Sequence, residues 1–124
     1  MKMLYFDLDG VICTATDGSY EKAEPIHDAI ATVNALFESG YRIVIFTSRF
    51  MGRTRGNAAE AQKLGFEFTT RQLAGWNVKF HELRLGKPVY DVLIDDRAVF
   101  FHPDWTAIRT DIERRCRASS AGKA

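Results

Sequence analysis

The chain has 124 residues, enough for one domain, and with 46% hydrophobic residues and nine Phe it can form a core without disulfides. Its 17 Lys and Arg nearly balance 16 Asp and Glu, and the net charge of +1 argues against a dedicated nucleic-acid-binding protein. No apolar run reaches the roughly 20 residues of a membrane span, no signal peptide is recognisable, and two cysteines fit a reducing, cytoplasmic setting.

Short apolar runs alternate with helical repeats along the chain. In chain order, the expected elements are a strand at 3–6, a helix at 26–37, a strand at 41–46, helices at 57–65 and 69–76, strands at 78–83, 89–94 and 98–101, and a helix at 101–116. This alternation predicts an α/β fold, a three-layer sandwich with a mainly parallel sheet covered on both faces. We assign residues 1–117 to one domain and expect a disordered tail at 118–124.

Polar groups follow each of the clearest strands. They are Asp7 and Asp9 after the first, Thr47, Ser48 and Arg49 after the second, and Asp95 and Asp96 after the strand at 89–94, with Lys87 just before that strand. Because the carboxyl ends of parallel strands share one edge, we expect these groups on a single rim. Crowded carboxylates repel one another unless a cation compensates. Mg²⁺ is the expected cation, and because it usually binds a substrate phosphate as well, the pattern indicates phosphate chemistry.

The spacing of the first acidic pair has a chemical meaning. In extended backbone Asp7 and Asp9 point the same way, so one carboxylate can attack phosphorus while the other handles the leaving-group proton. Gly10 then allows a sharp turn. Lys87 and Thr47 would hold the phosphoryl oxygens and offset the charge that spreads over them in the transition state.

Four segments in this order resemble the motifs of the haloacid dehalogenase superfamily. They are Phe-Asp-Leu-Asp-Gly-Val at 6–11, Ile-Phe-Thr at 45–47, Lys87, and Leu-Ile-Asp-Asp at 93–96. The match spans about residues 4–100, most of the chain. The resemblance implies a Rossmannoid phosphohydrolase that forms a phosphoaspartate and depends on Mg²⁺.

The resemblance also implies roles for single residues. Asp7 would be the nucleophile and contact Mg²⁺, and Asp9 would be the general acid, later the base, with its carbonyl on the metal. Thr47 and Lys87 would bind phosphate. Asp95 would ligate Mg²⁺ directly or through water, with Asp96 as its close alternate.

A finer similarity concerns residues 46–49 and 86–98, which are similar to small bacterial proteins of capsular-polysaccharide or sugar-phosphate biosynthesis. Neither the gap at 12–24 nor the second gap is long enough for a folded cap domain. We therefore expect an open, capless site that accepts a small phosphorylated metabolite, with no nucleic-acid or membrane partner. A neighbouring subunit in a homo-oligomer or a flap at 13–24 are the alternatives for covering it.

Several residues keep a second interpretation. Ser48 is a phosphate ligand or a turn hydroxyl, and Asp96 is a metal ligand or a turn cap. Arg49, Arg53 and Arg55 form a clamp for an anionic substrate or are solvated loop charges. The alternatives to a phosphohydrolase acting on a phosphomonoester, such as a sugar phosphate, are a phospho-accepting signalling receiver and an inactive binding module.

Overall fold

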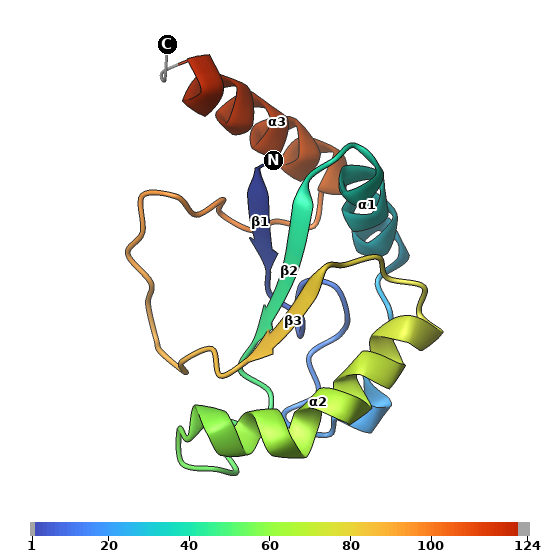
Figure 1. Cartoon of the computed structure of the whole chain (residues 1–124), viewed down its shortest axis with the longest axis vertical. Helices are drawn as coiled ribbons and strands as arrows, with labels where there is room; N and C mark the ends of the chain where they lie inside the picture. The colour runs from blue at the N-terminus through green and yellow to red at the C-terminus, as the bar shows by residue number, and fades with distance from the viewer. Residues whose placement is uncertain (1, 122–124) are drawn as a thin grey trace.

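Three parallel strands form the centre of the molecule. The computed structural model describes residues 2–121 and contains the strands β1 (Met3–Phe6), β2 (Arg42–Thr47) and β3 (Glu82–Leu85), in the order β1-β2-β3 (Figure 1). Phe6 lies opposite Ile45, which in turn lies opposite Leu83. The carboxyl ends of all three strands therefore meet at one edge of the sheet.

The helices are α1 (His27–Glu38), α2 (Ala58–Gly75) and α3 (Trp105–Ala121), with a short 3-10 turn η1 at Tyr20–Lys22. An α/β fold with a parallel sheet is therefore confirmed, and residues 2–121 include no separate cap domain. None of the helices in this range is long and apolar enough to cross a membrane.

The hydrophobic core lies on one face of the sheet. Every second strand side chain points to it: Leu4, Phe6, Ile43, Ile45, Leu83 and Leu85. The helices cover this face, and the rings of Phe6 and Trp105 stack with their centroids 6.4 Å apart. Each fully buried aliphatic side chain contributes roughly 1.5–3 kcal/mol. This face therefore holds α1, α2 and α3 onto the sheet.

The opposite face of the sheet mixes apolar, aromatic and charged side chains and is partly exposed, with Met3 53% and Tyr5 47% exposed. Tyr5 and Phe46 meet edge to face at 5.6 Å, and the Arg84 guanidinium lies over the Tyr5 ring. Glu82 pairs with both Arg84 and Arg42, and these charged partners hold the pKa of the Glu82 carboxyl below its usual value, mainly through the Arg84 hydrogen bond. Helices were expected on both faces of the sheet, and within this chain they cover one face.

The middle of the chain differs from the sequence prediction. The two helices expected at 57–65 and 69–76 are one helix, α2, which Asn57 caps by accepting the Glu60 N–H at 3.0 Å. Gly65 does not end a helix. It lies where α2 crosses Phe50 and Leu85, and a Cβ there would collide with both side chains.

The third strand begins later than expected, at Glu82 rather than at residue 78. The Val78 N–H bonds to the carbonyl of Leu73 at the end of α2, so this residue continues the helix terminus. His81 is the first residue to engage β2, since its N–H donates to the Ile43 carbonyl. Backbone groups already paired with a helix end cannot also join the sheet.

Residues 86–104, hereafter the arm, contradict the prediction most clearly. Neither expected strand, at 89–94 or at 98–101, forms, and the arm extends away from the sheet (Figure 1). Val92 is 73% exposed and Ile94 is 93% exposed. For the strand expected at 89–94 the physical reason is reach: the arm leaves β3 at the carboxyl edge of the sheet, and the four residues from Lys87 to Asp91 are too few to return to the amino edge, where a parallel strand would have to begin.

The last helix starts at Trp105 instead of residue 101, because the Asp104 side chain accepts the Ala107 N–H and begins the helix there. It continues to Ala121, so no helix end marks the expected boundary after residue 117. Residues 122–124 of the expected tail lie outside the described residues.

Candidate functional site

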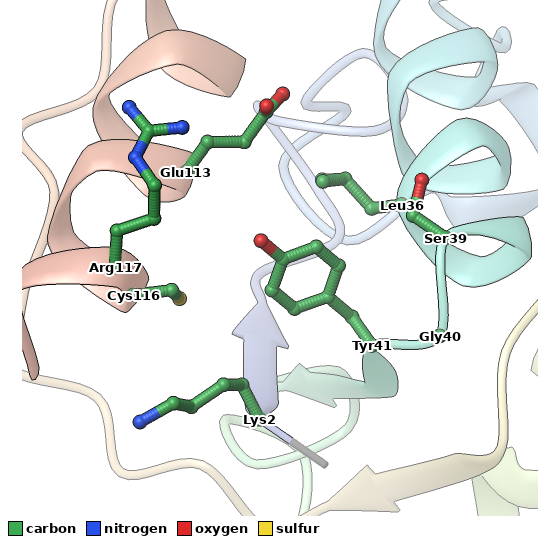
Figure 2. Close-up of a pocket in the computed structure, with 8 residues that line it drawn as sticks. All are labelled: Lys2, Leu36, Ser39, Gly40, Tyr41, Glu113, Cys116 and Arg117. Atoms are coloured by element: carbon green, nitrogen blue, oxygen red, sulfur yellow. The ribbon is translucent and has the colours of Figure 1, made fainter. Parts of the chain in front are cut away.

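Two hollows lie at opposite ends of the sheet. The larger, about 460 Å³, lies at the amino ends of β1 and β2, between α1 and α3 (Figure 2). Burial, with Cys116 and Glu113 nearby, raises the pKa of Tyr41 there. The smaller, about 310 Å³, lies at the carboxyl edge and is lined by Asp7, Asp9, Thr47, Ser48 and Arg49 among others. Parallel sheets hold their ligands at the carboxyl edge, so the smaller hollow is the candidate site.

Asp7 stands directly after β1, at the point where the sheet ends. Its Oδ1 accepts the Leu8 N–H at 2.8 Å, and its Oδ2 lies 3.4 Å from the Lys87 ammonium. The Asp7 side chain is partly open to solvent, whereas most of Lys87 is covered. A carboxylate oxygen is therefore presented at the rim beside one positive charge.

The loop after Asp7 wraps around a single carbonyl. The oxygen of fully buried Leu8 accepts the N–H groups of Val11, Ile12 and Cys13 at 2.9–3.2 Å. Gly10 makes this turn at a φ of +86°, a region that side chains disfavour. This winding fixes Asp9 against the core.

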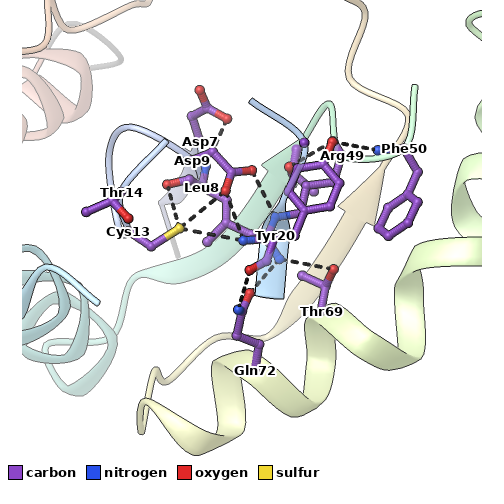
Figure 3. A network of polar contacts seen from close by, with 12 residues as sticks. Asp7, Leu8, Asp9, Cys13, Thr14, Tyr20, Arg49, Phe50, Thr69 and Gln72 are labelled. Carbon is purple, nitrogen blue, oxygen red and sulfur yellow. Dashed lines mark hydrogen bonds and ion pairs between the residues drawn. The ribbon is translucent and has the colours of Figure 1, made fainter. Parts of the chain in front are cut away.

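Arg49 is the centre of a buried polar network (Figure 3). Its Nε and Nη2 donate to the two carboxylate oxygens of Asp9, both at 2.9 Å, and Nη1 donates to Gln72 Oε1 at 2.6 Å. Its guanidinium also lies over the Tyr20 ring, 4.8 Å from the centroid. The Arg49 side chain is fully buried, so it is neither a solvated loop charge nor a free clamp. It holds Asp9 in place.

Thr47 and Lys87 are joined through the backbone. The Lys87 N–H donates to the Thr47 carbonyl at 3.1 Å, and the Thr47 hydroxyl accepts the Arg49 N–H at the same distance. Gly86 turns the chain at a φ of +96°, where a Cβ would press on Ala58. Ser48 lines the hollow at its turn. The structure thus brings together Asp7, Asp9, Thr47, Ser48 and Lys87.

The other two loop arginines lie apart from the carboxylates. Arg53 donates to the Gly18 carbonyl and its guanidinium covers the rings of Tyr20 and Phe50. Arg55 is exposed and sits in a turn with a φ of +53°. Their role in substrate binding stays a prediction, and Arg53 is engaged with the segment at residues 18–20.

Tyr20 and Gln72 help to hold the site residues in place, although the sequence did not indicate this role. Gln72 donates to the Tyr20 carbonyl at 2.8 Å and accepts from Arg49, and the Tyr20 hydroxyl accepts the Phe50 N–H at 3.1 Å. These contacts cross 23 to 52 positions of sequence. No local pattern marks such partners.

Cys13 is a packing residue, fully buried in the core. Burial, the neighbouring Asp9 carboxylate and a hydrogen bond to it raise the pKa of the thiol from 9.0 to about 12, although Arg49 acts in the opposite direction. A thiol that stays protonated is a poor nucleophile.

Asp95 and Asp96 do not join the other acids in this structure. Both are exposed in the arm, and the Asp95 carboxylate accepts the Arg97 N–H at 2.7 Å. Nowhere in residues 2–121 do three acidic, His or Cys side chains converge around a metal-sized space. Within a single chain, Asp7 is the carboxylate of the site that stands open to a hard cation. This fits the way Mg²⁺ binds through one or two carboxylates, water and a substrate phosphate.

Comparison with known proteins shows a shared fold. No protein-family model and no curated protein matches the chain. A structural-genomics target from Vibrio cholerae is 28% identical with a TM-score of 0.74, covering 90% of this chain and 98% of its own. The D,D-heptose 1,7-bisphosphate phosphatase of B. bronchiseptica, solved with magnesium and phosphate, is 21% identical with a TM-score of 0.49, over 94% of this chain and 64% of that protein. The chain therefore shares the α/β fold of the Vibrio cholerae protein over nine-tenths of its length.

Proposed function

We propose that the chain is a Mg²⁺-dependent phosphohydrolase of the haloacid dehalogenase type that cleaves a phosphomonoester of a small metabolite, such as a sugar phosphate. One observation carries the proposal. An open carboxylate, Asp7, stands at the carboxyl edge of the sheet with Lys87 3.4 Å away and Thr47 lining the same hollow. A nucleophile beside groups that bind phosphoryl oxygens is the arrangement that phosphoryl transfer needs.

The reaction would proceed in two displacements at phosphorus. An Asp7 oxygen forms a bond to phosphorus while the bond to the ester oxygen breaks, and that oxygen leaves as an alcohol with a proton from Asp9. Water then attacks phosphorus of the aspartyl phosphate and gives its proton to Asp9, which releases inorganic phosphate and restores Asp7. Covalent catalysis of this kind replaces one difficult step by two easier ones.

The surrounding side chains would divide the remaining work. Lys87 and the Thr47 hydroxyl, with Ser48 beside it, would hold the non-bridging oxygens and offset the charge that develops on them. Arg49 binds both oxygens of Asp9, but each carboxylate oxygen has two lone-pair positions, so Asp9 keeps a site for the transferred proton. Arg49 is accordingly a positioning residue.

Mg²⁺, when bound, would neutralise phosphate charge at the rim. Asp7 is the carboxylate that one copy offers it, and the backbone carbonyl of Asp9 and the carboxylates of Asp95 or Asp96 are the further ligands we propose. The residues at the rim are hard oxygen donors, which suit this ion.

A panel of phosphomonoesters, including a generic aryl phosphate, tests the proposal when each is incubated with the full chain with and without Mg²⁺. Repeated turnover that requires the ion is the expected result. A stable phosphoprotein formed once per chain would indicate the receiver alternative, and no reaction with any member of the panel would indicate a binding module. Either result would contradict the proposed activity.

A further inference from the structure

The arm exposes apolar side chains that a folded protein normally buries. Between Val89 and Ile94 the sequence has the pattern of a buried strand, yet Val89 is 74% exposed, Val92 is 73% exposed and Ile94 is 93% exposed. Val92 and Ile94 alternate, so in a strand both would face the same side. An extended apolar segment with free backbone groups pairs readily with an open sheet edge.

β1 has such an open edge. It is the outer strand of the order β1-β2-β3 and pairs with β2 alone among the described strands. A strand that placed Asp95 level with Asp7 on this edge would put Ile94 level with Phe6 and Val92 level with Leu4, on the core face. This register would bury two of the three most exposed positions of the segment and bring a third carboxylate to the rim.

The arm cannot take up this register in its own copy. Leu85 is level with Thr47, and the Lys87 N–H bonds to the Thr47 carbonyl, so the arm begins at the carboxyl end of β3. In a parallel strand with Asp95 level with Asp7, Asp91 would be level with Met3, on the order of 20 Å away along and across the sheet. The four residues from Lys87 to Asp91 span at most about 14 Å.

We propose that two copies of this chain exchange their arms, so that residues 89–94 of each extend the sheet beside β1 of the other. Each active site would then combine Asp7, Asp9, Thr47 and Lys87 of one copy with Asp95 of its partner. Exchange of an identical segment between two copies is a low-cost route to a dimer. The assignment of Asp95 to the site rests on the proposed function, whereas the exchange itself does not.

The oligomeric state gives the first test, by light scattering on purified full-length chain. Wild type is expected at twice the mass of one chain. Ile94→Asp is expected at the mass of one chain with an unchanged circular dichroism spectrum, because Ile94 is 93% exposed within a copy. Leu64→Asp, a matched change at an exposed apolar residue of α2, is expected to stay dimeric. A monomeric wild type, or a dimer that survives Ile94→Asp, would overturn the exchange.

Disulfide trapping tests the same contact without using activity or the Ile94 variant. In a Cys116→Ser background, a copy with Tyr5→Cys is refolded together with a copy with Leu93→Cys, which the proposed register places side by side. Oxidation is expected to link the two different copies. Leu64→Cys in place of Leu93→Cys is the control and is expected to give no link. A link that forms equally well with the control, or not at all with Leu93→Cys, would contradict the register.

Complementation tests whether the exchanged arm completes the site. Asp7→Asn and Asp95→Asn are inactive alone in this account, but after joint refolding the mixed dimer has one site with both carboxylates intact. About one quarter of wild-type activity is expected, since half of the dimers are mixed and half of their sites are complete. No recovery in a mixture whose dimer forms would remove Asp95 from the partner's site. An inactive wild type that still forms the dimer would instead refute the proposed function and leave the exchange standing.

Discussion

The two acidic pairs of this chain, at residues 7 and 9 and at 95 and 96, both follow apolar segments but are fixed very differently. Asp9 is bound through both oxygens by the buried Arg49, and Asp7 lies beside Lys87 at the end of a paired strand. Within residues 2–121, the one hydrogen bond of the Asp95 carboxylate comes from the nearby Arg97 backbone, and Asp95 lies in the exposed arm. A strand pattern thus places a side chain only where the chain can reach a partner strand.

The largest effect is expected at the well-fixed pair. Asp7→Asn removes the attacking oxygen's charge, and we expect hydrolysis of an aryl phosphate to fall by at least about 1,000-fold, as for loss of other nucleophiles. Because Asp7 lies at the rim, the melting temperature should change little. The matched change Asp28→Asn, in the first turn of α1, should keep wild-type activity. An active Asp7→Asn protein would contradict the role of this pair.

The second effect concerns what fixes Asp9. Arg49→Met leaves this carboxylate, 22% exposed, without its buried partner, and we expect the free energy of unfolding to fall by about 2–4 kcal/mol. Arg53→Met is the control, because Arg53 packs against the same Tyr20 ring from an exposed position and should cost about 1 kcal/mol or less. Urea denaturation of both variants measures the difference. Equal losses would mean that the Asp9 pair contributes nothing beyond surface packing.

A smaller effect is expected where α2 packs closely against the sheet. Gly65→Ala places a Cβ against Phe50 and Leu85, and overpacking of this kind should destabilise the fold by about 1–3 kcal/mol. Gly75→Ala, at the end of the same helix, meets no neighbour within 4 Å and should be neutral or slightly stabilising. Thermal melts of the two variants that shift in the same direction would contradict the close contact of α2 with β3.

The smallest effect is a dependence on pH. The pKa of Cys13 is about 12 in the folded chain against 9.0 for an ordinary thiol, so folding favours the protonated form. Above pH 9 the Cys13 thiol loses its proton in the unfolded chain but keeps it in the folded chain, which stabilises the unfolded state. The free energy of unfolding should therefore decrease as the pH rises above 9. In Cys13→Ala this part of the pH dependence should be absent. Denaturant titrations between neutral and alkaline pH compare the two proteins, and identical slopes would contradict the raised pKa.

Much of the sheet and its first helix was predictable from the sequence. The apolar run of β1, the β-branched run of β2 and the helical repeat of α1 appear within about one residue of their expected ranges, because each is a strong local pattern next to a partner that the chain can reach. Gly65 misled the prediction, since a glycine required for packing looks the same in sequence as one that ends a helix.

The site was predictable in part for the same reason. Asp7 and Asp9 follow β1, Thr47 ends β2 and Lys87 follows β3, and the sheet brings them together. The partners of Arg49 come from α2 and from the segment around Tyr20, and only the folded chain relates them. The prediction that Asp95 joins the site was wrong within one copy, because periodicity identifies a strand but does not show whether the connection before it is long enough.

Chemical trapping of the aspartyl phosphate is the sharpest test of Asp7 as the nucleophile. The full chain is quenched during turnover of an aryl phosphate with Mg²⁺ and treated with borohydride, which reduces an aspartyl phosphate to homoserine. Mass spectrometry of the peptides then locates the modified position. We predict homoserine at position 7 and an unmodified aspartate at position 9. Turnover without any homoserine, or homoserine at another aspartate, would contradict it.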